Sequence, residues 1–413
     1  MRIERGGIDE GGLLRPSTAM LLGLVWRERR ISRADLARRA EVARSTVTRT
    51  VNALLPTGLL REVGEGVSRG GRRPILLAFQ DEAYGVAGVE LGNTRVAVAL
   101  TDLRGRVLAW EEEPHAVRED PEGARALAAE LVARCLAAWR RGPAGLVCIG
   151  VALSCPIDTG APTLLPTVEL PAWRGEPGLE TLRSRFGVPV LLDNDANLGA
   201  LAEHRWGAGQ GVPNLAYLAI TGGVGAGHVI DGRLYRGQTG VAGELGHFPA
   251  DPAGVRCSCG MRGCLSSTVG VPAVERRAGR LAASHPGSAL GEPPVTLATL
   301  ARAALAEDPV ALRAVAETVD PLANALSVLL NLNNPGRVVI GGGLLRLGEA
   351  LLGPLRQAVQ DRTRASSAGA VAIVAGALGE RAVAVGAATM ALEHALADLR
   401  LFPPLRRGAA CPG

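Results

Sequence analysis

Two segments of the chain repeat one order of short apolar runs separated by turns. The first contains runs at 86–91, 95–101 and 107–111, and the second contains runs at 215–221, 226–230 and 234–235. Each run is of strand length, and the turns between them are rich in glycine, asparagine and aspartate. Each segment therefore predicts an antiparallel meander, and the repetition predicts a duplicated α/β fold.

Both meanders continue with elements typical of a parallel sheet. After the first, 121–140 predicts a helix, the unbroken apolar run 146–153 predicts a buried parallel strand, and 188–192 predicts another strand. After the second, 338–340 predicts a strand that ends in a glycine turn, followed by a helix from about Leu344. Two such units predict two lobes with a ligand cleft between them.

The first 80 residues differ from the rest in charge. They contain 15 arginines and 8 acidic residues, a net charge of +7, whereas residues 81–413 have a net charge of −2. A basic segment beside a nearly neutral body predicts a polyanionic partner, with an ordinary solvated basic face as the alternative. None of the 45 basic residues is a lysine, which excludes a Walker-A loop and Schiff-base chemistry.

The chain shows no membrane or export signal. No run approaches the roughly 18 apolar residues of a membrane helix, and the first ten residues are charged. The seven cysteines are an odd number, which favours a reducing compartment over a disulfide framework. We therefore expect a cytoplasmic protein that does not bind membranes.

The basic segment has the order of elements of a winged helix–turn–helix domain. After a first helix, a second one is predicted at about 33–40, where Ser32 and Asp35 form a capping box. A third helix, at about 43–54, has apolar residues at helical spacing that should face inward: Val47, Val51 and Leu54. Its remaining residues form an outer face.

That outer face and the following wing are the candidate DNA-binding surface. Strands predicted at 59–63 and 74–79 enclose a glycine-rich basic tip, suited to phosphates or a minor groove. Short polar side chains and arginines on the third helix suit base edges in a major groove. The predicted DNA-binding residues are Arg44, Ser45, Thr46, Thr48, Arg49, Arg69, Arg72 and Arg73. A protein-binding winged helix is the alternative.

Four residues of the second segment have the spacing of a metal site. They are His247, Cys257, Cys259 and Cys264. One imidazole and three thiolates are the ligands that tetrahedral zinc prefers, and a closed set of four leaves no position for water. The sequence therefore predicts a structural zinc ion, with free thiols as the alternative.

Asn194 and Asp195 follow the strand predicted at 188–192, at the edge of a lobe. A lone Asn-Asp pair in that place is most simply a helix N-cap. At the edge of a cleft, the carboxylate can also accept a hydrogen bond from a ligand hydroxyl or take its proton. Both interpretations remain open on these residues alone.

Together these motifs resemble the repressor–ORF–kinase (ROK) family of sugar-responsive transcription regulators and sugar kinases. The resemblance spans essentially the whole chain and rests on four motifs: Gly-Arg-Arg-Pro at 71–74, Asn-Asp-Ala-Asn at 194–197, Gly-Glu-Leu-Gly-His at 243–247, and the cysteine cluster. It implies a duplicated actin-like (sugar-kinase, ribonuclease-H-like) two-lobe body behind a winged helix–turn–helix domain. The implied domains are a head (1–80), a first lobe (81–193 plus about 383–400), a second lobe with the zinc loop (194–382) and a tail (401–413).

The resemblance also implies ligand contacts. In the family's kinases, the residue matching Asp195 is the general base that deprotonates the sugar. Glu244 matches a residue that accepts sugar hydroxyls, and His247 matches one that ligates zinc beside the sugar. The family's asparagine before Leu-Pro-x-Trp matches Glu169. With Asn194, these residues form the predicted site for a carbohydrate-like ligand.

Several positions depart from the kinase pattern. The family's first phosphate turn, Asp-x-Gly-Gly-Thr-Lys, is Glu-Leu-Gly-Asn-Thr-Arg at 90–95, and its second, Gly-Thr-Gly-x-Gly, is Thr-Gly-Gly-Val-Gly at 221–225. A longer acid, a lost glycine and a lost hydroxyl should all weaken ATP and metal binding. The sugar side also departs, at Glu169 and at Ser266, where the family has glutamate. The pocket therefore need not accept glucose or N-acetylglucosamine.

The leading hypothesis is a homodimeric (or dimer-of-dimers) repressor that binds a pseudo-palindromic DNA operator and responds to a carbohydrate-like effector. It is not expected to be an enzyme. One alternative is an ATP-dependent sugar kinase that retains the DNA-binding head and uses Asp195 as general base. Another is a body that binds a phosphotransfer-system component instead of a sugar.

Overall fold

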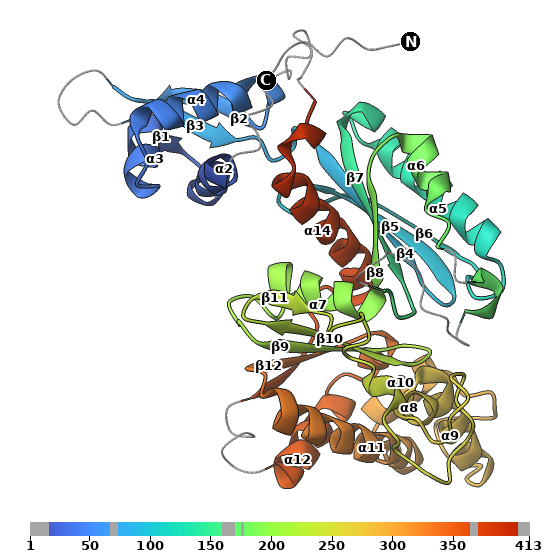
Figure 1. The fold of residues 1–413 in the computed structure, drawn as a ribbon. Helices are drawn as coiled ribbons and strands as arrows, with labels where there is room; N and C mark the ends of the chain where they lie inside the picture. Colours follow the sequence, from blue (N-terminus) through green and yellow to red (C-terminus); the bar gives the residue numbers. More distant parts are fainter. Residues whose placement is uncertain (1–15, 67–72, 159–169, 175–176, 364–370, 404–413) are drawn as a thin grey trace.

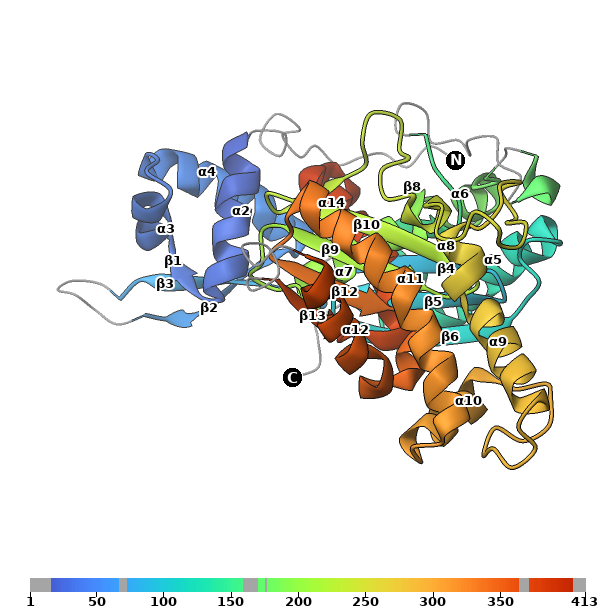
Figure 2. The same cartoon turned by 90° about the horizontal axis from the view of Figure 1, so that it is seen from below.

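The computed structural model describes residues 16–66, 73–158, 170–174, 177–363 and 371–403. They form a small head and a body of two lobes (Figure 1). Figure 2 shows that the head stands to one side of the body. Within these residues, no helix is both long enough and apolar enough to span a bilayer.

The head contains three helices and a small antiparallel sheet. The helices are α2 (Pro16–Glu28), α3 (Arg33–Arg39) and α4 (Arg44–Leu54), and the strands are β1 (Ile31–Ser32), β2 (Leu60–Glu65) and β3 (Ile75–Phe79), in the order β1-β3-β2. The predicted cap of α3 is present, because the amide of Asp35 donates to Ser32 Oγ at 3.1 Å. Sequence analysis missed the two-residue strand β1, which is too short to show a periodicity.

The first lobe is a five-stranded sheet in the order β6-β5-β4-β7-β8. Its strands are β4 (Gly85–Leu91), β5 (Arg95–Asp102), β6 (Val107–Pro114), β7 (Leu146–Leu153) and β8 (Val190–Asn194). β4 pairs antiparallel with β5 and parallel with β7. Helices α5 (Pro121–Ala138) and α6 (Glu180–Phe186) pack with it around one apolar core. The last strand ends two residues later than predicted, so Asn194 is its final residue.

The second lobe repeats this sheet as β11-β10-β9-β12-β13, which confirms the predicted duplication. Its strands are β9 (Leu215–Ile220), β10 (Val224–Ile230), β11 (Arg233–Tyr235), β12 (Arg337–Gly341) and β13 (Ala372–Ala375). Five helices share a core with it: α8 (Leu265–Val269), α9 (Val271–Ala283), α10 (Leu297–Leu305), α11 (Pro309–Asn333) and α12 (Glu349–Arg362). The helix expected from Leu344 is wrong, because a 3₁₀ helix occupies Gly343–Leu347 and α12 begins at Glu349.

Two further helices, α7 (Asp195–Trp206) and α14 (Ala382–Ala397), lie between the two sheets (Figure 1). α14 packs on β4 and β7 of the first lobe, whereas α7 packs on β9 and β10 of the second, and the two helices pack on each other. The contact with the first sheet is close, because a Cβ at Gly88 would overlap the carbonyl oxygen of Ala384. α14 is buried almost all round, which explains its uniformly small and apolar sequence.

The head is joined to the body through a continuous core. Leu36, Val47 and Leu77 of the head share a cluster with Ala391 and Leu392 of α14. The expected tail from 401 onward begins too early. Phe402 is 2% exposed and its ring packs edge-on against Tyr84 at 5.1 Å. Phe402 lies beyond the end of α14 and outside any helical or strand periodicity, so its packing role was not visible from the sequence.

Candidate functional site: cleft, metal cluster and DNA-binding face

A cavity of about 850 Å³ lies between the lobes. This volume falls in the usual range of small-molecule sites, about 300–1,000 Å³. Its lining comes from both lobes and brings together four of the predicted ligand residues: Asn194, Asp195, Glu244 and His247. The fifth, Glu169, lies outside the described residues. Both altered turns also line the cavity, so the predicted sugar side and phosphate side share one space.

Asn194 and Asp195 are placed at the start of α7. Asn194 is its N-cap, and its side-chain oxygen accepts hydrogen bonds from the amides of Ala196 and Asn197. Its side-chain nitrogen donates to the carbonyl of Cys155 at 3.2 Å. The helix-cap interpretation of Asn194 is thus present in the structure. Asp195 accepts a hydrogen bond from Ser154 Oγ at 2.5 Å and borders the cavity beside it.

The two remaining predicted ligand residues form a pair. Glu244 and His247 flank the 3₁₀ turn Leu245–His247, and His247 Nε2 lies 3.4 Å from Glu244 Oε2. Both side chains are partly exposed, at 36% and 20% respectively. The other ring nitrogen, Nδ1, lies 4.0 Å from Cys257 Sγ. His247 therefore joins the cleft to the cysteine cluster.

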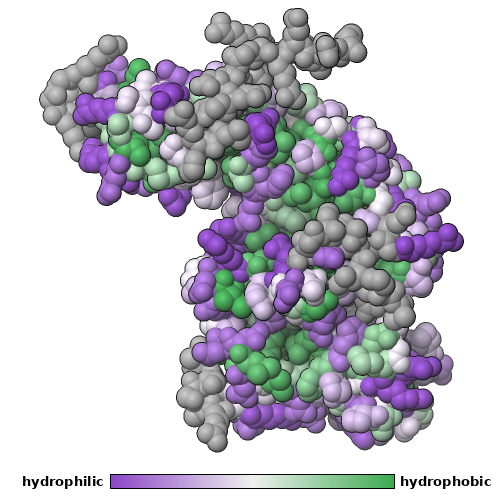
Figure 3. Space-filling model, in the orientation of Figure 1, coloured by the Kyte–Doolittle hydropathy of each residue, from purple (hydrophilic) through white to green (hydrophobic). Residues whose placement is uncertain are grey.

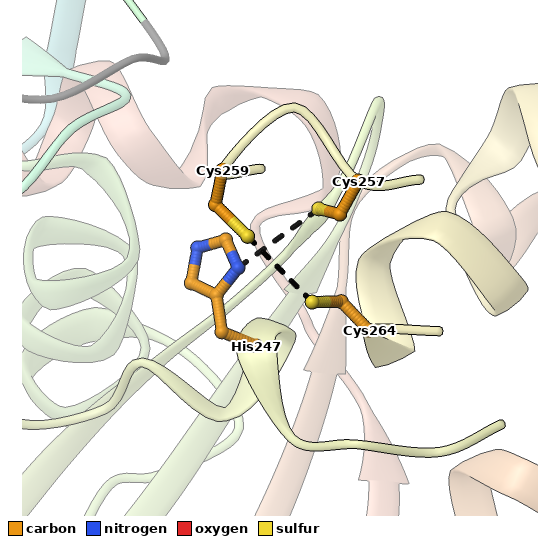
Figure 4. Close-up of side chains that lie close together, drawn as sticks. All are labelled: His247, Cys257, Cys259 and Cys264. Carbon is orange, nitrogen blue, oxygen red and sulfur yellow. Dashed lines mark hydrogen bonds between the residues drawn. The ribbon is translucent and has the colours of Figure 1, made fainter. Parts of the chain in front are cut away.

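The cysteine cluster has the geometry of a metal site. Figure 4 shows the side chains of His247, Cys257, Cys259 and Cys264 pointing toward one another from the 3₁₀ turn and the loop after it. Their ligand atoms all lie within 4.8 Å of one another, and Cys259 Sγ is 3.6 Å from Cys264 Sγ. Zinc–sulfur bonds of about 2.3 Å in a tetrahedron require sulfur–sulfur separations of about 3.8 Å. The four residues therefore fit an ion of that size.

The first altered turn is held by an ion pair. Arg95 Nη2 lies 3.3 Å from Glu90 Oε2, and the same guanidinium contacts Glu112 and Glu380. Burial raises the pKa of Glu90 to about 7, and Arg95 opposes that rise. Glu380 is also bound by Arg346 of the second lobe at 2.8 Å, and this hydrogen bond lowers the pKa of Glu380. The carboxylate of the first turn is thus engaged by the chain itself.

The second altered turn faces the first across the cleft. The side-chain nitrogen of Asn93 lies 3.4 Å from the position that a Cβ on Gly222 would take. Behind the turn, Ser266 Oγ accepts the amide of Val224 at 2.9 Å. The residue that replaces the family's glutamate therefore stabilises the turn. Asn93 thus lies between the two altered turns, where both line the cavity.

Sequence analysis missed one polar contact between the lobes. Asp193, at the end of the first sheet, is 4% exposed and accepts a hydrogen bond from Arg236 Nε at 2.7 Å. Arg236 follows β11 of the second lobe. The signal was an acid directly before the Asn-Asp pair, but its partner is distant in sequence and only the fold brings them together.

The DNA-binding prediction falls on an exposed face of α4. Arg44, Ser45, Thr48 and Arg49 are exposed and Thr46 is half-buried, while Val47, Val51 and Leu54 are buried. Figure 3 shows hydrophilic residues around the outer edge of the head. Arg73 is weakly paired with Glu65 at 3.8 Å. Arg69 and Arg72 lie outside the described residues.

Arg44 and Arg49 differ from the arginines of α3 in their pairing. Arg33, Arg38 and Arg39 each form an ion pair with an acidic side chain. Among the described residues, neither Arg44 nor Arg49 has a hydrogen bond or an ion pair. Arg61 on β2 is likewise exposed and without such a partner there. Sequence analysis missed Arg61, although its place beside the predicted wing was a signal.

Comparison with known proteins identifies the family. The ROK family model matches residues 86–394, which is most of the body. The chain belongs to the ROK family. It is 28% identical to the xylose repressor of Bacillus spizizenii over 388 residues, covering 94% of this chain and 98% of that protein.

Two solved ROK structures, a transcription regulator and a kinase, differ in how much of this chain they cover. A ROK transcriptional regulator described as a homolog of the E. coli MLC protein superposes with a TM-score of 0.79 at 25% identity, over 95% of this chain and 98% of its own. A ROK glucokinase from Streptomyces griseus matches with a TM-score of 0.65 at 28% identity. It covers 75% of this chain and 99% of its own. The chain therefore has the full extent of a ROK regulator and shares its body with ROK kinases.

Proposed function

We propose that this ROK protein is a homodimeric transcription repressor that releases its operator when a carbohydrate-like effector binds in the cleft. The observation that carries the proposal is the head, whose α4 presents Arg44 and Arg49 without ion-pair partners on an exposed face. Exposed arginines without an ion-pair partner are suited to bind guanine edges and phosphates. The full-length likeness to a ROK regulator and to the xylose repressor supports the same role.

The effector site is proposed at Asp195, Glu244 and His247, with Glu169 and Asn194 beside it. Carboxylates and an imidazole around a polar cavity suit a ligand with several hydroxyl groups. Asn194 contributes chiefly by capping α7, which fixes the position of Asp195. Because the start of α7 is fixed, the Asp195 carboxylate can favour an effector hydroxyl in one orientation.

The metal at His247, Cys257, Cys259 and Cys264 is proposed to be structural zinc. Three sulfurs and one imidazole nitrogen match the preference of zinc, and four protein ligands leave no open position. Bound zinc would order the loop that carries these cysteines. The loop in turn holds His247 next to Glu244, so the shape of the effector site depends on the metal.

Kinase activity is proposed to be absent. A general base alone does not transfer a phosphoryl group, because the transition state needs positioned phosphates and metal. Here Glu90 is paired with Arg95, and Asn93 stands against Gly222 where a phosphate would pass. Asp195 would then accept a hydroxyl hydrogen bond without taking the proton.

The proposal is tested by binding of the purified protein to DNA that it selects from a random pool. We expect sequence-specific binding at physiological salt, a two-fold symmetric consensus, and weaker binding when a sugar from a panel is added. R44A/R49A should abolish specific binding. R302A/R313A, at two exposed arginines on α10 and α11 of the second lobe, removes the same charge and serves as the matched control. Equal affinity for selected and random DNA would sink the proposal.

A further inference from the structure

Helix α7 spans the distance from the cleft to the contact between the body and the head. It begins at Asp195, which borders the cavity, and ends at Trp206. Its 12 residues extend about 18 Å at 1.5 Å per residue. α7 directly follows β8 of the first lobe and packs on β9 and β10 of the second lobe, so a rotation of one lobe against the other would turn the helix about its Asp195 end. Its far end touches the first lobe.

Trp206 makes that contact. Its indole packs against the turn between β5 and β6, where a Cβ on Gly105 would lie only 2.5 Å from Trp206 Cε2. Gly105 also has a φ of +75°, so this position requires glycine for two reasons. The indole nitrogen donates to Thr389 Oγ1 of α14 at 2.8 Å. The ring is therefore held between the turn and α14.

The same turn holds the head. Arg104, next to Gly105, donates to Asp81 Oδ1 at 2.6 Å and to the carbonyl of Trp26 on α2 at 2.8 Å. Its guanidinium also lies 4.7 Å from the centre of the Trp26 ring. In return, Trp26 Nε1 donates to the carbonyl of Leu103 at 3.1 Å. The turn is thus bound to α2 by two hydrogen bonds and a cation–π contact, and to Asp81 by a third hydrogen bond.

A second contact fixes α7 to the connection between the lobes. Glu203 is fully buried, and its carboxylate accepts the amides of Ala377 and Leu378 at 3.1 and 2.9 Å. These two residues link β13 of the second lobe to the start of α14. A buried carboxylate bound to that link keeps α7 and the link together when the lobes move. The last turn of α7, which carries Trp206, is thus fixed to the link between the lobes.

We propose that Trp206 is the positioning residue through which the ligand state of the cleft reaches the head. A ligand that brings the second lobe toward the first turns α7 about its Asp195 end, and Trp206 at the other end then shifts the turn that Arg104 ties to α2. The coupling needs no direct contact between ligand and head. It requires only that the Trp206 side chain prefers one position when the cleft holds a ligand and another when it does not. This inference rests on the proposed function.

The test uses the full chain and two conservative variants. W206F keeps an aromatic ring but loses the indole donor, and T389V removes its acceptor at nearly constant volume. R205Q is the matched control, because Arg205 is the adjacent residue and pairs with Glu393 of α14 on the surface at 2.5 Å. Circular dichroism and melting confirm that each variant is folded. The probe is whichever of D-xylose, D-glucose and N-acetylglucosamine most alters operator binding by the wild-type protein.

Allosteric coupling usually changes affinity by about 5- to 150-fold. We expect W206F to bind the sugar and the free operator within about threefold of the wild-type values, while the sugar changes its operator affinity by less than about twofold. T389V should lose part of the coupling, and R205Q should retain it. Wild-type coupling in folded W206F and T389V would overturn the inference. A wild-type protein that binds no operator would instead refute the proposed function.

A second readout needs neither sugar nor DNA. Amide hydrogen exchange of residues 102–106 and of the Trp26 indole reports whether the turn is held in the free protein. We expect faster exchange there in W206F and T389V than in R205Q, because the turn loses its support. Wild-type exchange rates in both variants would overturn the inference independently of any effector.

Discussion

The two sides of the cleft differ in how their polar side chains are arranged. On one side, Asp195, Glu244 and His247 border the cavity, and the fold fixes them with a helix cap and a cysteine loop. On the other side, Glu90 is paired with Arg95 and Asn93 stands against Gly222. Asp195 and Glu244 line the cavity, whereas Glu90 is paired with Arg95 and is not part of the lining. The two sides therefore differ in whether their carboxylates reach the ligand space.

The largest expected effect concerns the zinc ion proposed at the cysteine cluster beside Glu244 and His247. C264S should lose zinc and lower the melting temperature by about 10 °C or more, because a structural zinc site contributes directly to folding. Sugar binding should fall with it, since His247 belongs to both sites. Metal analysis and calorimetry check this result. C135A, at a buried cysteine outside the cluster, should retain zinc.

The next effect compares the two carboxylates directly. D195N should weaken effector binding by about 10-fold or more, because a hydrogen bond to a charged group contributes about 1.5–3 kcal/mol. E90Q should change it by less than about twofold, since Arg95 already engages Glu90. Isothermal titration with the same sugar measures both. Equal losses in the two variants would contradict the division of the cleft.

A smaller effect follows from the raised pKa of Glu90, which burial brings to about 7. Between the ordinary pKa of a glutamate, near 4.3, and about 7, the folded protein binds a proton that the unfolded chain releases. The wild-type protein therefore loses stability as pH rises through this window. E90Q mimics the protonated form and should be spared this loss.

We expect E90Q to gain about 1 kcal/mol relative to the wild-type protein between pH 4.5 and pH 8, since Arg95 loses its partner and offsets part of the effect. Urea unfolding at the two pH values measures the difference. E112Q, an exposed partner of the same arginine, is the control and should show no such pH trend. An E90Q difference that shrinks with rising pH would contradict the raised pKa of Glu90.

Sequence analysis predicted the duplicated sheets because strand periodicity and glycine turns are local signals. It also placed the capping box of α3 and the inward face of α4, which depend on residues three or four positions apart. It could not find helices α9 to α11, where no motif drew attention, nor the buried packing of Phe402. Those features depend on partners far along the chain.

The candidate site divides in the same way. The cysteine cluster was visible as spacing within one loop, and the structure brings its four ligand atoms together. The ion pair of Asp193 with Arg236 and the contact of Trp206 with Gly105 were not visible, because each joins the two lobes. The spacing of residues within one loop can be recognised in the sequence. Contacts between the lobes cannot, because they form only when both sheets have folded.

One measurement tests the central claim most directly. Operator affinity of the full chain is titrated with each sugar in the presence of ATP, and release of ADP is recorded in the same samples. The account predicts sequence-specific binding that one sugar weakens by about 5- to 150-fold, with ADP release no greater than in the absence of protein. Sugar-dependent ADP release, together with operator affinity that no sugar changes, would contradict it.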